Sequence, residues 1–274
     1  MKIIRLLQGS DDWHRHRILY RNASEAAAVM GLSPWQTPYQ LWEIKTGRRV
    51  QEQTFPMLRG IELEPLARQA YEAETGRIME PAVMVDGDYS ASLDGITFDL
   101  ERILEVKCPL KGRESETWKL AEKGLLEPHY EVQVQHQLMV SGAGHCDFYV
   151  FDGKTGVTVE VSPSEETFGS IRQAWDEFWK FVVSDTPPPI TERDTVMRED
   201  LAWREAAERY VLAKESAENA VELAEKAKER LVTLANHNRE QGFGVAVCRF
   251  WKGKVNSKEE VRVTVLKQQE GEPC

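Results

Sequence analysis

The segment SDTPPPIT, residues 184–191, divides the chain into two stretches of different composition. Proline lacks a backbone N–H and its ring clashes with the preceding helical turn, so neither a helix nor a central strand continues through three consecutive prolines. Before this segment, short helical and strand patterns alternate, whereas after it comes a long stretch without glycine or proline. The sequence therefore predicts a folded core at 1–183, a linker at 184–191 and an extension at 192–274.

The extension has the pattern of a long helix followed by paired strands. Residues 197–238 are rich in Ala, Glu, Lys and Leu, which favours one long helix or a helical hairpin. Apolar side chains recur there in steps of three and four, but Lys214 and Lys228 interrupt the stripe, so it fits a coiled coil only in part. FGVAVCRFW and EEVRVTVL, residues 243–251 and 259–266, predict two strands joined by the turn GKVNS.

Composition limits the class of protein. A chain of 274 residues and 31.4 kDa buries a sizeable core, and its 41% hydrophobic and 29% charged residues are typical of a soluble globular protein. The sequence has no apolar run of the roughly 18 to 20 residues that span a bilayer, and its amino-terminal apolar patch is too short for a signal peptide. We therefore expect a cytoplasmic protein without a membrane partner.

Cysteine spacing excludes some kinds of site, whereas net charge leaves the kind of partner open. Cys108, Cys146, Cys248 and Cys274 form no CxxC pair, which argues against zinc, an iron–sulfur cluster or a disulfide framework. The net charge of -10 is unusual for a surface that contacts phosphates. A nuclease that binds a divalent metal needs local carboxylates, however, so the charge leaves a nucleic-acid partner open.

Capping patterns predict two helices early in the core. NASEAAAVMG, residues 22–31, has Asn22 and Glu25 at the spacing of a capping box and a glycine as its stop. TPYQLWEIKTG, residues 37–47, has Thr37 as its cap, proline at the first helical position and glycine at its end. Both segments are expected to form short helices.

A third helix is predicted in RGIELEPLARQAYEAETG, residues 59–76, because its apolar residues fall on one stripe. Pro65 suits the first turn of a helix, where its missing N–H costs nothing. Glu64 is therefore expected at or just before the helix start.

The stretch SLDGITFDLERILEVKCP, residues 92–109, reads as an apolar hairpin that carries charged groups. Successive side chains of a strand alternate between its two faces, so Glu105 and Lys107 point the same way. If Asp94 ends the preceding strand before a turn at Gly95, the hairpin places its carboxylate beside that of Glu105. The pattern thus predicts two acids and a base at one place.

This combination suits metal-dependent hydrolysis of a phosphodiester. The two carboxylates and a backbone carbonyl, such as that of Val106, are the hard oxygen ligands that Mg2+ or Mn2+ prefers. A bound metal lowers the pKa of a water, and an ammonium orients that water or stabilises charge in the transition state. The plain alternative is a solvated ion pair on a strand face, worth at most about 1 kcal/mol.

Ordered blocks over residues 8–162 resemble one family. They are QGSDDWHRHR with NASEAAAVMG, the helix RGIELEPLARQAYEAETG, then SLDG, LEVKCP and the Gln-rich YEVQVQHQLMVSG. Together they resemble the lambda-type phage exonucleases and the related YqaJ-like viral recombinases, within the PD-(D/E)xK nuclease superfamily. The resemblance implies an α/β fold: a restriction-endonuclease-like core with a mixed central sheet flanked by helices, to which the C-terminal long helix and β-hairpin are added.

The resemblance also implies roles for individual residues. Asp94 and Glu105 would bind Mg2+ or Mn2+ with the carbonyl of Val106, and Lys107 would be the catalytic lysine. Glu64 would supply a further acid from the helix, directly to the metal or through water. Gln133 would pack near the lysine and metal, although it also suits the exposed side of an amphipathic helix.

The amino-terminal block implies a pocket for a terminal 5'-phosphate. Arg17 and Ser24 match the family's phosphate-binding positions, and a guanidinium forks onto phosphate oxygens. Arg15 is an alternative to Arg17, and a local cap is the alternative role for Ser24. The tryptophans Trp13, Trp35 and Trp42 are expected to be packing residues rather than platforms for bases.

The family implies a phage or prophage enzyme that degrades linear double-stranded DNA from 5' ends in a bacterial host. It would leave 3' single strands for an annealing partner, and its lambda-type members form a trimeric ring. Two alternatives remain open: a structure-selective endonuclease with the same metal site, and a non-catalytic DNA-binding or assembly protein built around the long helix.

Overall fold

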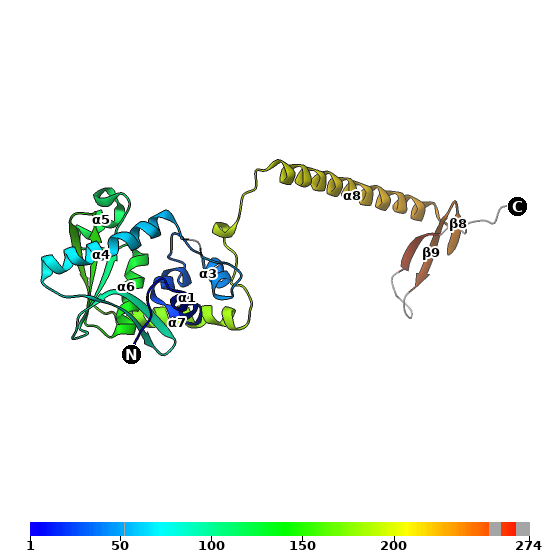
Figure 1. The fold of residues 1–274 in the computed structure, drawn as a ribbon. Coiled ribbons are helices and arrows are strands. Elements are labelled where there is room, and N and C mark those ends of the chain that lie inside the picture. The colour runs from blue at the N-terminus through cyan, green and yellow to red at the C-terminus, as the bar shows by residue number, and fades with distance from the viewer. Residues whose placement is uncertain (52, 252–258, 267–274) are drawn as a thin grey trace. The chain divides into compact units, whose positions relative to one another are not determined.

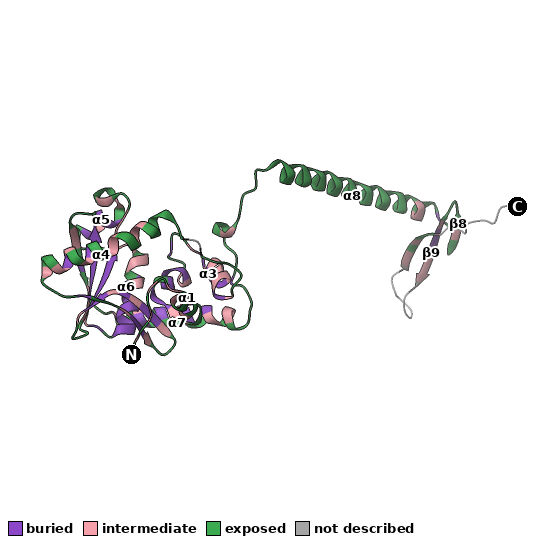
Figure 2. Cartoon of the chain, in the orientation of Figure 1, coloured by how far each residue is buried: buried purple, intermediate pink, exposed green. Residues whose placement is uncertain are grey.

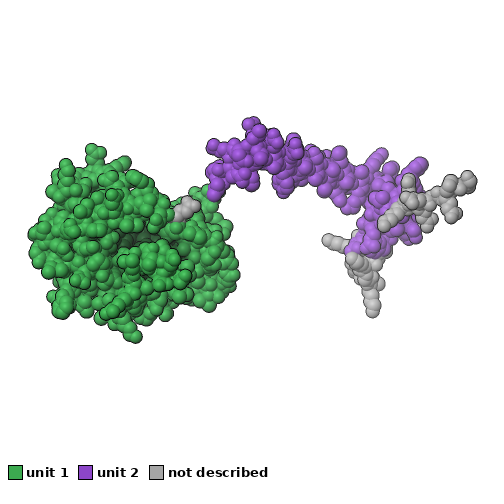
Figure 3. Space-filling view, in the orientation of Figure 1, with its two compact units in different colours: residues 1–195 green, residues 196–274 purple. Residues whose placement is uncertain are grey.

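The computed structural model describes residues 1–51, 53–251 and 259–266, and these form two compact units (Figures 1 and 3). The first unit is Met1–Thr195 and the second is Val196–Cys274. The boundary lies beyond the predicted linker because the chain after the prolines is still attached to the first unit: Arg193 donates a 2.9 Å hydrogen bond to the Ser33 carbonyl oxygen.

A mixed sheet forms the centre of the first unit. Its order is β1-β3-β4-β5-β6-β7, with β2 beside β4. The pairs β5–β6 and β2–β4 are parallel and the other pairs are antiparallel. The strands are β1 (Lys2–Ile4), β2 (Arg21–Asn22), β3 (Glu80–Asp86), β4 (Tyr89–Ile96), β5 (Arg102–Lys107), β6 (His145–Phe151) and β7 (Gly156–Val161).

Helices cover both faces of this sheet, and the buried residues, purple in Figure 2, lie on the strands and on the helices that pack against them. Val134 and Leu138 of α6 and Trp175 of α7 belong to the larger apolar cluster on one face, and Tyr71 of α4 belongs to the smaller cluster with Leu104 on the other. The fold class is therefore as predicted. The helices are α1 (Asp11–Leu19), α2 (Ala26–Val29), α3 (Pro38–Lys45), α4 (Phe55–Thr75), α5 (Glu116–Ala121), α6 (Pro128–Ser141) and α7 (Glu165–Val183), with 3-10 turns at Ala23–Glu25, Gly112–Glu114 and Glu192–Asp194.

The two early caps have different outcomes. Thr37 caps α3 as predicted, because its hydroxyl accepts the N–H of Gln40 and the Gln40 side chain accepts the N–H of Thr37. The capping box expected at Asn22 is wrong. The Asn22 amide instead donates to Glu25 Oε2 at 2.8 Å, and the segment forms a 3-10 turn followed by the single turn of α2.

The predicted start of α4 is also wrong. The helix begins at Phe55, with Thr54 at its N-cap and Pro56 in its first turn, so Pro65 lies inside it. An internal proline removes one helical hydrogen bond, and Glu64 accordingly sits in the middle of α4 rather than at its start. The end at Gly76 was predicted correctly, and φ is +71° there.

The second unit contains the long helix α8 (Leu201–Leu234) and an antiparallel sheet of β8 (Arg239–Gly242), β9 (Val245–Trp251) and β10 (Glu259–Val265). One long helix, rather than a helical hairpin, is therefore formed. Within this unit the stripe residues Trp203, Tyr210 and Val221 are exposed. The strand β8 was not predicted, since REQG lacks apolar alternation, and the predicted turn GKVNS lies outside the described residues.

Among the described residues, no helix combines the length and apolar composition that crossing a bilayer requires.

Candidate active site

Asp94 and Glu105 meet where β4 and β5 separate. The two strands pair through Gly95–Leu104 and Ile96–Ile103. Next to these pairs, the N–H of Val106 donates to a side chain of β4 rather than to its backbone. The acceptor is Asp94 Oδ2, at 2.8 Å. The predicted hairpin is thus present, although β4 continues past Gly95 to Ile96 and the turn comes later.

Glu105 is almost fully buried and receives hydrogen bonds on both carboxylate oxygens. Its Oε1 contacts the Lys107 ammonium and accepts the Gln133 amide at 2.7 Å. Its Oε2 accepts the Gln137 amide at 2.6 Å. Lys107 Nζ also lies 3.4 Å from Gln133 Oε1. The predicted residues Glu105, Lys107 and Gln133 therefore form one contact cluster, and Gln137 is an additional member.

Glu64 reaches this cluster from α4 on the other side of the sheet. Its Oε1 accepts Arg68 Nη1 at 3.3 Å, one helical turn away. The same Nη1 donates to the backbone carbonyl oxygen of Asp94 at 2.9 Å. Arg68 thus joins Glu64 of the helix to Asp94 of the hairpin, and the ion pair of Glu64 with Arg68 forms at the site itself.

The crowding of carboxylates affects their protonation. Burial raises the pKa of Asp94 well above its usual range, and the charges of Glu105 and Glu64 raise it further. Burial also raises the pKa of Glu64. For Lys107, burial alone would lower the pKa, but the neighbouring carboxylate of Glu105 reverses this effect and raises it. The ammonium therefore stays protonated at neutral pH.

Within the described residues, no group of three or more His, Cys, Asp and Glu side chains is arranged as a ready metal cage. Glu105 instead accepts hydrogen bonds from Lys107, Gln133 and Gln137. The donor set nevertheless fits a hard cation. Carboxylate oxygens are the ligands Mg2+ prefers, and the mutual repulsion that raises the pKa of Asp94 is relieved by a divalent charge.

Arg17 and Ser24, the two residues predicted to bind a 5'-phosphate, contact each other. Arg17 Nη1 donates to Ser24 Oγ at 3.1 Å, and its Nη2 pairs with Glu25 Oε1 at 3.0 Å. Behind them lies Lys45, whose buried Nζ is 2.6 Å from Glu25 Oε2. Arg15, the alternative to Arg17, instead forms an exposed pair with Asp12 at 3.2 Å.

A series of contacts connects Arg17 to the carboxylates. The guanidinium of Arg17 lies 4.7 Å from the Trp13 ring centroid, and Trp13 Nε1 donates to Ser92 Oγ at 2.9 Å. The carbonyl oxygen of Ser92 accepts the Gln137 amide at 3.2 Å, and that amide also binds Glu105. Ser92 and Asp94 share one face of β4, since alternate residues of a strand point the same way.

Sequence reasoning missed Glu25, Lys45 and the part played by Gln137. A weak signal existed for Gln137, because it lies four residues after Gln133 and therefore on the same face of α6. Nothing local marked Lys45, whose partners come from residues 17–25. The prediction that tryptophans are packing residues is confirmed for the buried Trp42, whereas Trp35 contacts His129 and Tyr130 but is 68% exposed.

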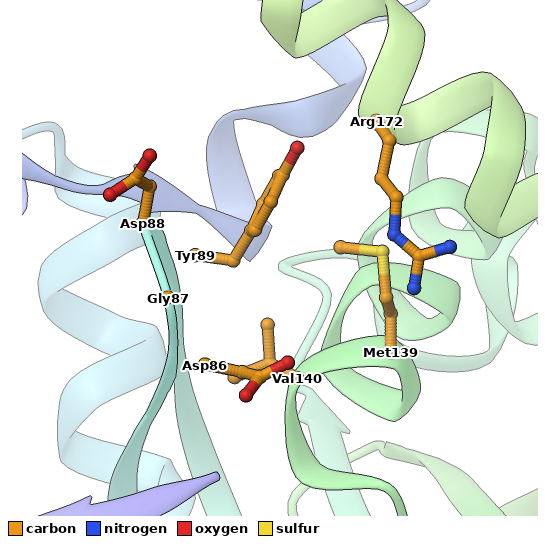
Figure 4. A pocket seen from close by; sticks show the side chains of 7 residues that line it. All are labelled: Asp86, Gly87, Asp88, Tyr89, Met139, Val140 and Arg172. Carbon is orange, nitrogen blue, oxygen red and sulfur yellow. The ribbon is translucent and has the colours of Figure 1, made fainter.

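A pocket of about 420 Å³ lies elsewhere in the first unit (Figure 4). It is lined by acidic residues of the β3–β4 turn together with residues of α6 and Arg172 of α7. None of the predicted site residues lines it, and the candidate active site lies at the strand separation described above. The lining residues are Asp86, Gly87, Asp88, Tyr89, Met139, Val140 and Arg172.

Comparison with known families gives a match over residues 12–144 to the YqaJ-like viral recombinase domain. Residues 12–144 are therefore similar to a viral recombinase domain of the YqaJ type. The matched range contains every residue of the candidate site, from Arg17 to Gln137. The resemblance read from the sequence blocks is thereby confirmed.

Individual proteins are also similar to this chain. The YqaJ-like chain is 27% identical over 231 residues to the uncharacterized protein YqaJ of Bacillus subtilis (strain 168), which covers 81% of this chain and 69% of that protein. It is also similar to the crystal structure of an alkaline exonuclease, LHK-Exo, from Laribacter hongkongensis. That structure is 26% identical with a TM-score of 0.53, and the match covers 64% of this chain and 94% of LHK-Exo.

A second LHK-Exo structure, in complex with dAMP, gives a TM-score of 0.56 at 24% identity, with 64% of this chain and 94% of that chain covered. The YqaJ-like domain thus has an exonuclease-like fold. The match covers the greater part of the chain but leaves more than a third of it outside. In sequence and fold the chain is thus similar to an alkaline exonuclease.

Proposed function

We propose that this protein is a Mg2+-dependent exonuclease that degrades one strand of linear double-stranded DNA in the 5'-to-3' direction. The observation that carries the proposal is the connection between two sites. The cluster of Asp94, Glu105 and Lys107 is joined through Gln137, Ser92 and Trp13 to Arg17, which contacts Ser24. The groups proposed to hydrolyse the DNA are thus linked, through three side chains, to the residues proposed to bind the phosphate at the strand end.

The metal would be held by Asp94, Glu105 and the carbonyl oxygen of Val106, with Glu64 bound directly or through water. Bound Mg2+, or Mn2+ in its place, supplies an acidified water and stabilises charge on the phosphate. Arg68 keeps Glu64 beside Asp94, and the two glutamine amides fix the plane of the Glu105 carboxylate.

Lys107 acts as a cation in this proposal. Because neighbouring acids raise its pKa, the ammonium is a poor base and does not remove the proton of the attacking water. Its Nζ contacts Glu105 and Gln133, which hold it in place to orient that water and to stabilise the negative charge that develops on the phosphate.

In each cycle, the oxygen of one water forms a bond to phosphorus and the bond from phosphorus to the 3'-oxygen of the terminal nucleotide breaks. The leaving oxygen takes up a proton, so a 5'-mononucleotide departs and the shortened strand has a new 5'-phosphate. Arg17 and Ser24 would bind the phosphate at the strand end. That LHK-Exo was crystallised with dAMP, a product of this type, supports the reaction proposed for this chain.

The 3' single strand that remains would pass to a single-strand annealing protein in phage-type recombination, in keeping with the YqaJ-like viral recombinase domain. Assembly into a trimeric ring would keep the remaining strand enclosed while the other is degraded. The protein would thus bind an annealing protein and further copies of itself, and it would act in the cytoplasm of a bacterial host.

The test is digestion of linear and closed circular duplex DNA with Mg2+ or with chelator, using 5'-phosphate and 5'-hydroxyl ends. We expect loss of the linear form only, in Mg2+ only, faster by about 10- to 100-fold with 5'-phosphate, because a charge-assisted contact is worth about 1.5–3 kcal/mol. Ser24→Ala and Arg17→Ala should reduce this preference. Cutting of the circle would instead show an endonuclease, and the absence of any Mg2+-dependent cleavage would favour a binding protein.

A further prediction concerns Gln137, whose amide holds Glu105 Oε2. Gln137→Leu should lower the rate of digestion by roughly 10-fold and raise the Mg2+ concentration needed for half-maximal rate, because loss of a group supporting a metal ligand costs about 10- to 100-fold. The matched control is Gln135→Leu, since Gln135 is equally buried on α6 but binds the backbone of Ser162 and Ser164. An unchanged Mg2+ requirement in Gln137→Leu would contradict the assigned role.

A further inference from the structure

Trp35 presents an exposed indole beside aromatic side chains that lead to Lys107. Although tryptophan is usually well buried, this residue is 68% exposed. Its position is defined, because Ser33 Oγ accepts the N–H groups of Trp35 and Gln36 at 3.3 and 3.1 Å. Its ring centroid lies 4.7 Å from that of His129, with the two planes at 88°.

The neighbouring rings continue from the indole to the active site. Trp35 is 6.0 Å from Tyr130 between ring centroids, and His129 is 4.1 Å from Tyr130. Tyr130 packs against the buried Phe148 at 5.5 Å, and Lys107 Nζ lies 4.8 Å from the Tyr130 ring centroid. Trp35 is therefore separated from the catalytic ammonium by a single side chain.

We propose that Trp35 is a stacking platform for a nucleobase of the strand that is being cut. This inference rests on the proposed function and adds a binding site that the hydrolytic cluster does not contain. Every base has an aromatic face, so stacking on an indole accepts any sequence, as a nuclease that digests DNA of any sequence requires. A DNA strand advances roughly 3.4 Å per nucleotide, which puts Trp35 within reach of the first few nucleotides beside the scissile phosphate.

The surroundings of Trp35 suit a base better than a phosphate. Burial lowers the pKa of His129, and the charge of Lys107 lowers it further, so the imidazole is neutral at pH 7. The indole and its two aromatic neighbours thus form an uncharged surface next to the charged cluster. The base would stack on this surface while its phosphate is held by the groups around Lys107.

The experiment uses the full chain and a 5'-phosphorylated duplex that carries 2-aminopurine at one of the first few positions of the 5'-ended strand. Binding is measured in chelator, where no cleavage is expected, from the quenching of 2-aminopurine and from fluorescence anisotropy. Trp35→Ala should weaken binding by about 5- to 150-fold and remove the quenching, because stacking is worth about 1–3 kcal/mol per base. Trp35→Phe should keep most of both signals. Trp203→Ala, which removes a 54% exposed indole from α8, is the matched control.

A duplex with an abasic site at the quenched position completes the test. The wild-type protein should bind it less tightly than the intact duplex, whereas Trp35→Ala should bind both equally. Equal quenching by wild type and Trp35→Ala, or quenching only of a label in the complementary strand, would overturn the stacking role. If these results came with normal Mg2+-dependent digestion by the wild type, the proposed function would stand, whereas failure of the wild type to bind or digest duplex ends would remove both.

Discussion

Replacing Lys107 by alanine is expected to lower the rate of DNA digestion by about 10²- to 10³-fold, the usual effect of removing one group that stabilises charge in a transition state. The ammonium contacts Glu105 and Gln133 and is kept protonated by the neighbouring acid, whereas Arg68, the other cation at the site, contacts Glu64 and the Asp94 carbonyl oxygen. The measurement is the initial rate on linear duplex with a 5'-phosphate at saturating DNA.

Two conditions make this result specific. Removing the ammonium leaves Asp94, Glu105 and Glu64 less compensated, so Mg2+ must be varied until the rate no longer increases. Lys111→Ala is the matched control, because Lys111 is an exposed lysine a few residues further along and should keep the wild-type rate. If Lys107→Ala retained more than about a tenth of that rate at saturating Mg2+, another residue would have to perform the role given to Lys107.

The hairpin of the site was predictable because it depends on local periodicity. Alternation along β5 put Glu105 and Lys107 on one face, and the structure places both against Gln133. The alternation of side chains does not predict where β4 separates from β5. At that point the Asp94 carboxylate accepts the N–H of Val106. That arrangement depends on two strands and a helix packed together, which no short stretch of sequence specifies.

The errors in the helices have a similar cause. Proline suits a first helical turn, which is why Pro65 predicts a start, but Pro56 occupies that position in a helix that begins earlier. Packing of Ala67 and Tyr71 offsets the hydrogen bond lost at Pro65. At Asn22 the capping pattern was overridden by Glu25, whose side chain is held by groups distant in sequence. A capping pattern in the sequence therefore fails where a buried charged residue, here Glu25, binds the side chain expected to form the cap, here Asn22.

This buried charge predicts the largest effect on stability. Glu25 and Lys45 are 6% and 5% exposed, and Glu25 lies between Lys45 Nζ and the guanidinium of Arg17. Burial alone would raise the pKa of Glu25, but Lys45 and Arg17 reverse this and lower it. Glu25→Gln leaves the Lys45 ammonium buried without its counter-ion, which should reduce the free energy of unfolding by about 3–5 kcal/mol. The melting temperature would fall by roughly 6 to 20 °C.

The pH dependence identifies Lys45 as the cause. Burial already lowers the pKa of Lys45 in the folded protein, and loss of Glu25 removes the main group that opposes this. The unfolded chain then binds more protons than the folded one, so the stability deficit of Glu25→Gln should shrink as pH rises toward the ordinary lysine pKa of about 10.4. Glu43→Gln, at the half-exposed pair with Arg49, is the control and should change stability by no more than about 1 kcal/mol.

The double variant Glu25→Gln, Lys45→Met should recover most of the lost stability, because a buried pair replaced as a whole leaves no unpaired charge. The carbonyl oxygens of Arg17 and Tyr20 lose Lys45 as a donor but keep the Asn22 amide, at 2.7 and 3.0 Å. Urea unfolding of the single and double variants between pH 7 and 10 measures these differences. A double variant as unstable as Glu25→Gln alone would show that Glu25 stabilises the fold through Arg17 rather than through Lys45. The role of the Glu25 carboxylate would then be to hold Arg17 in the proposed phosphate pocket.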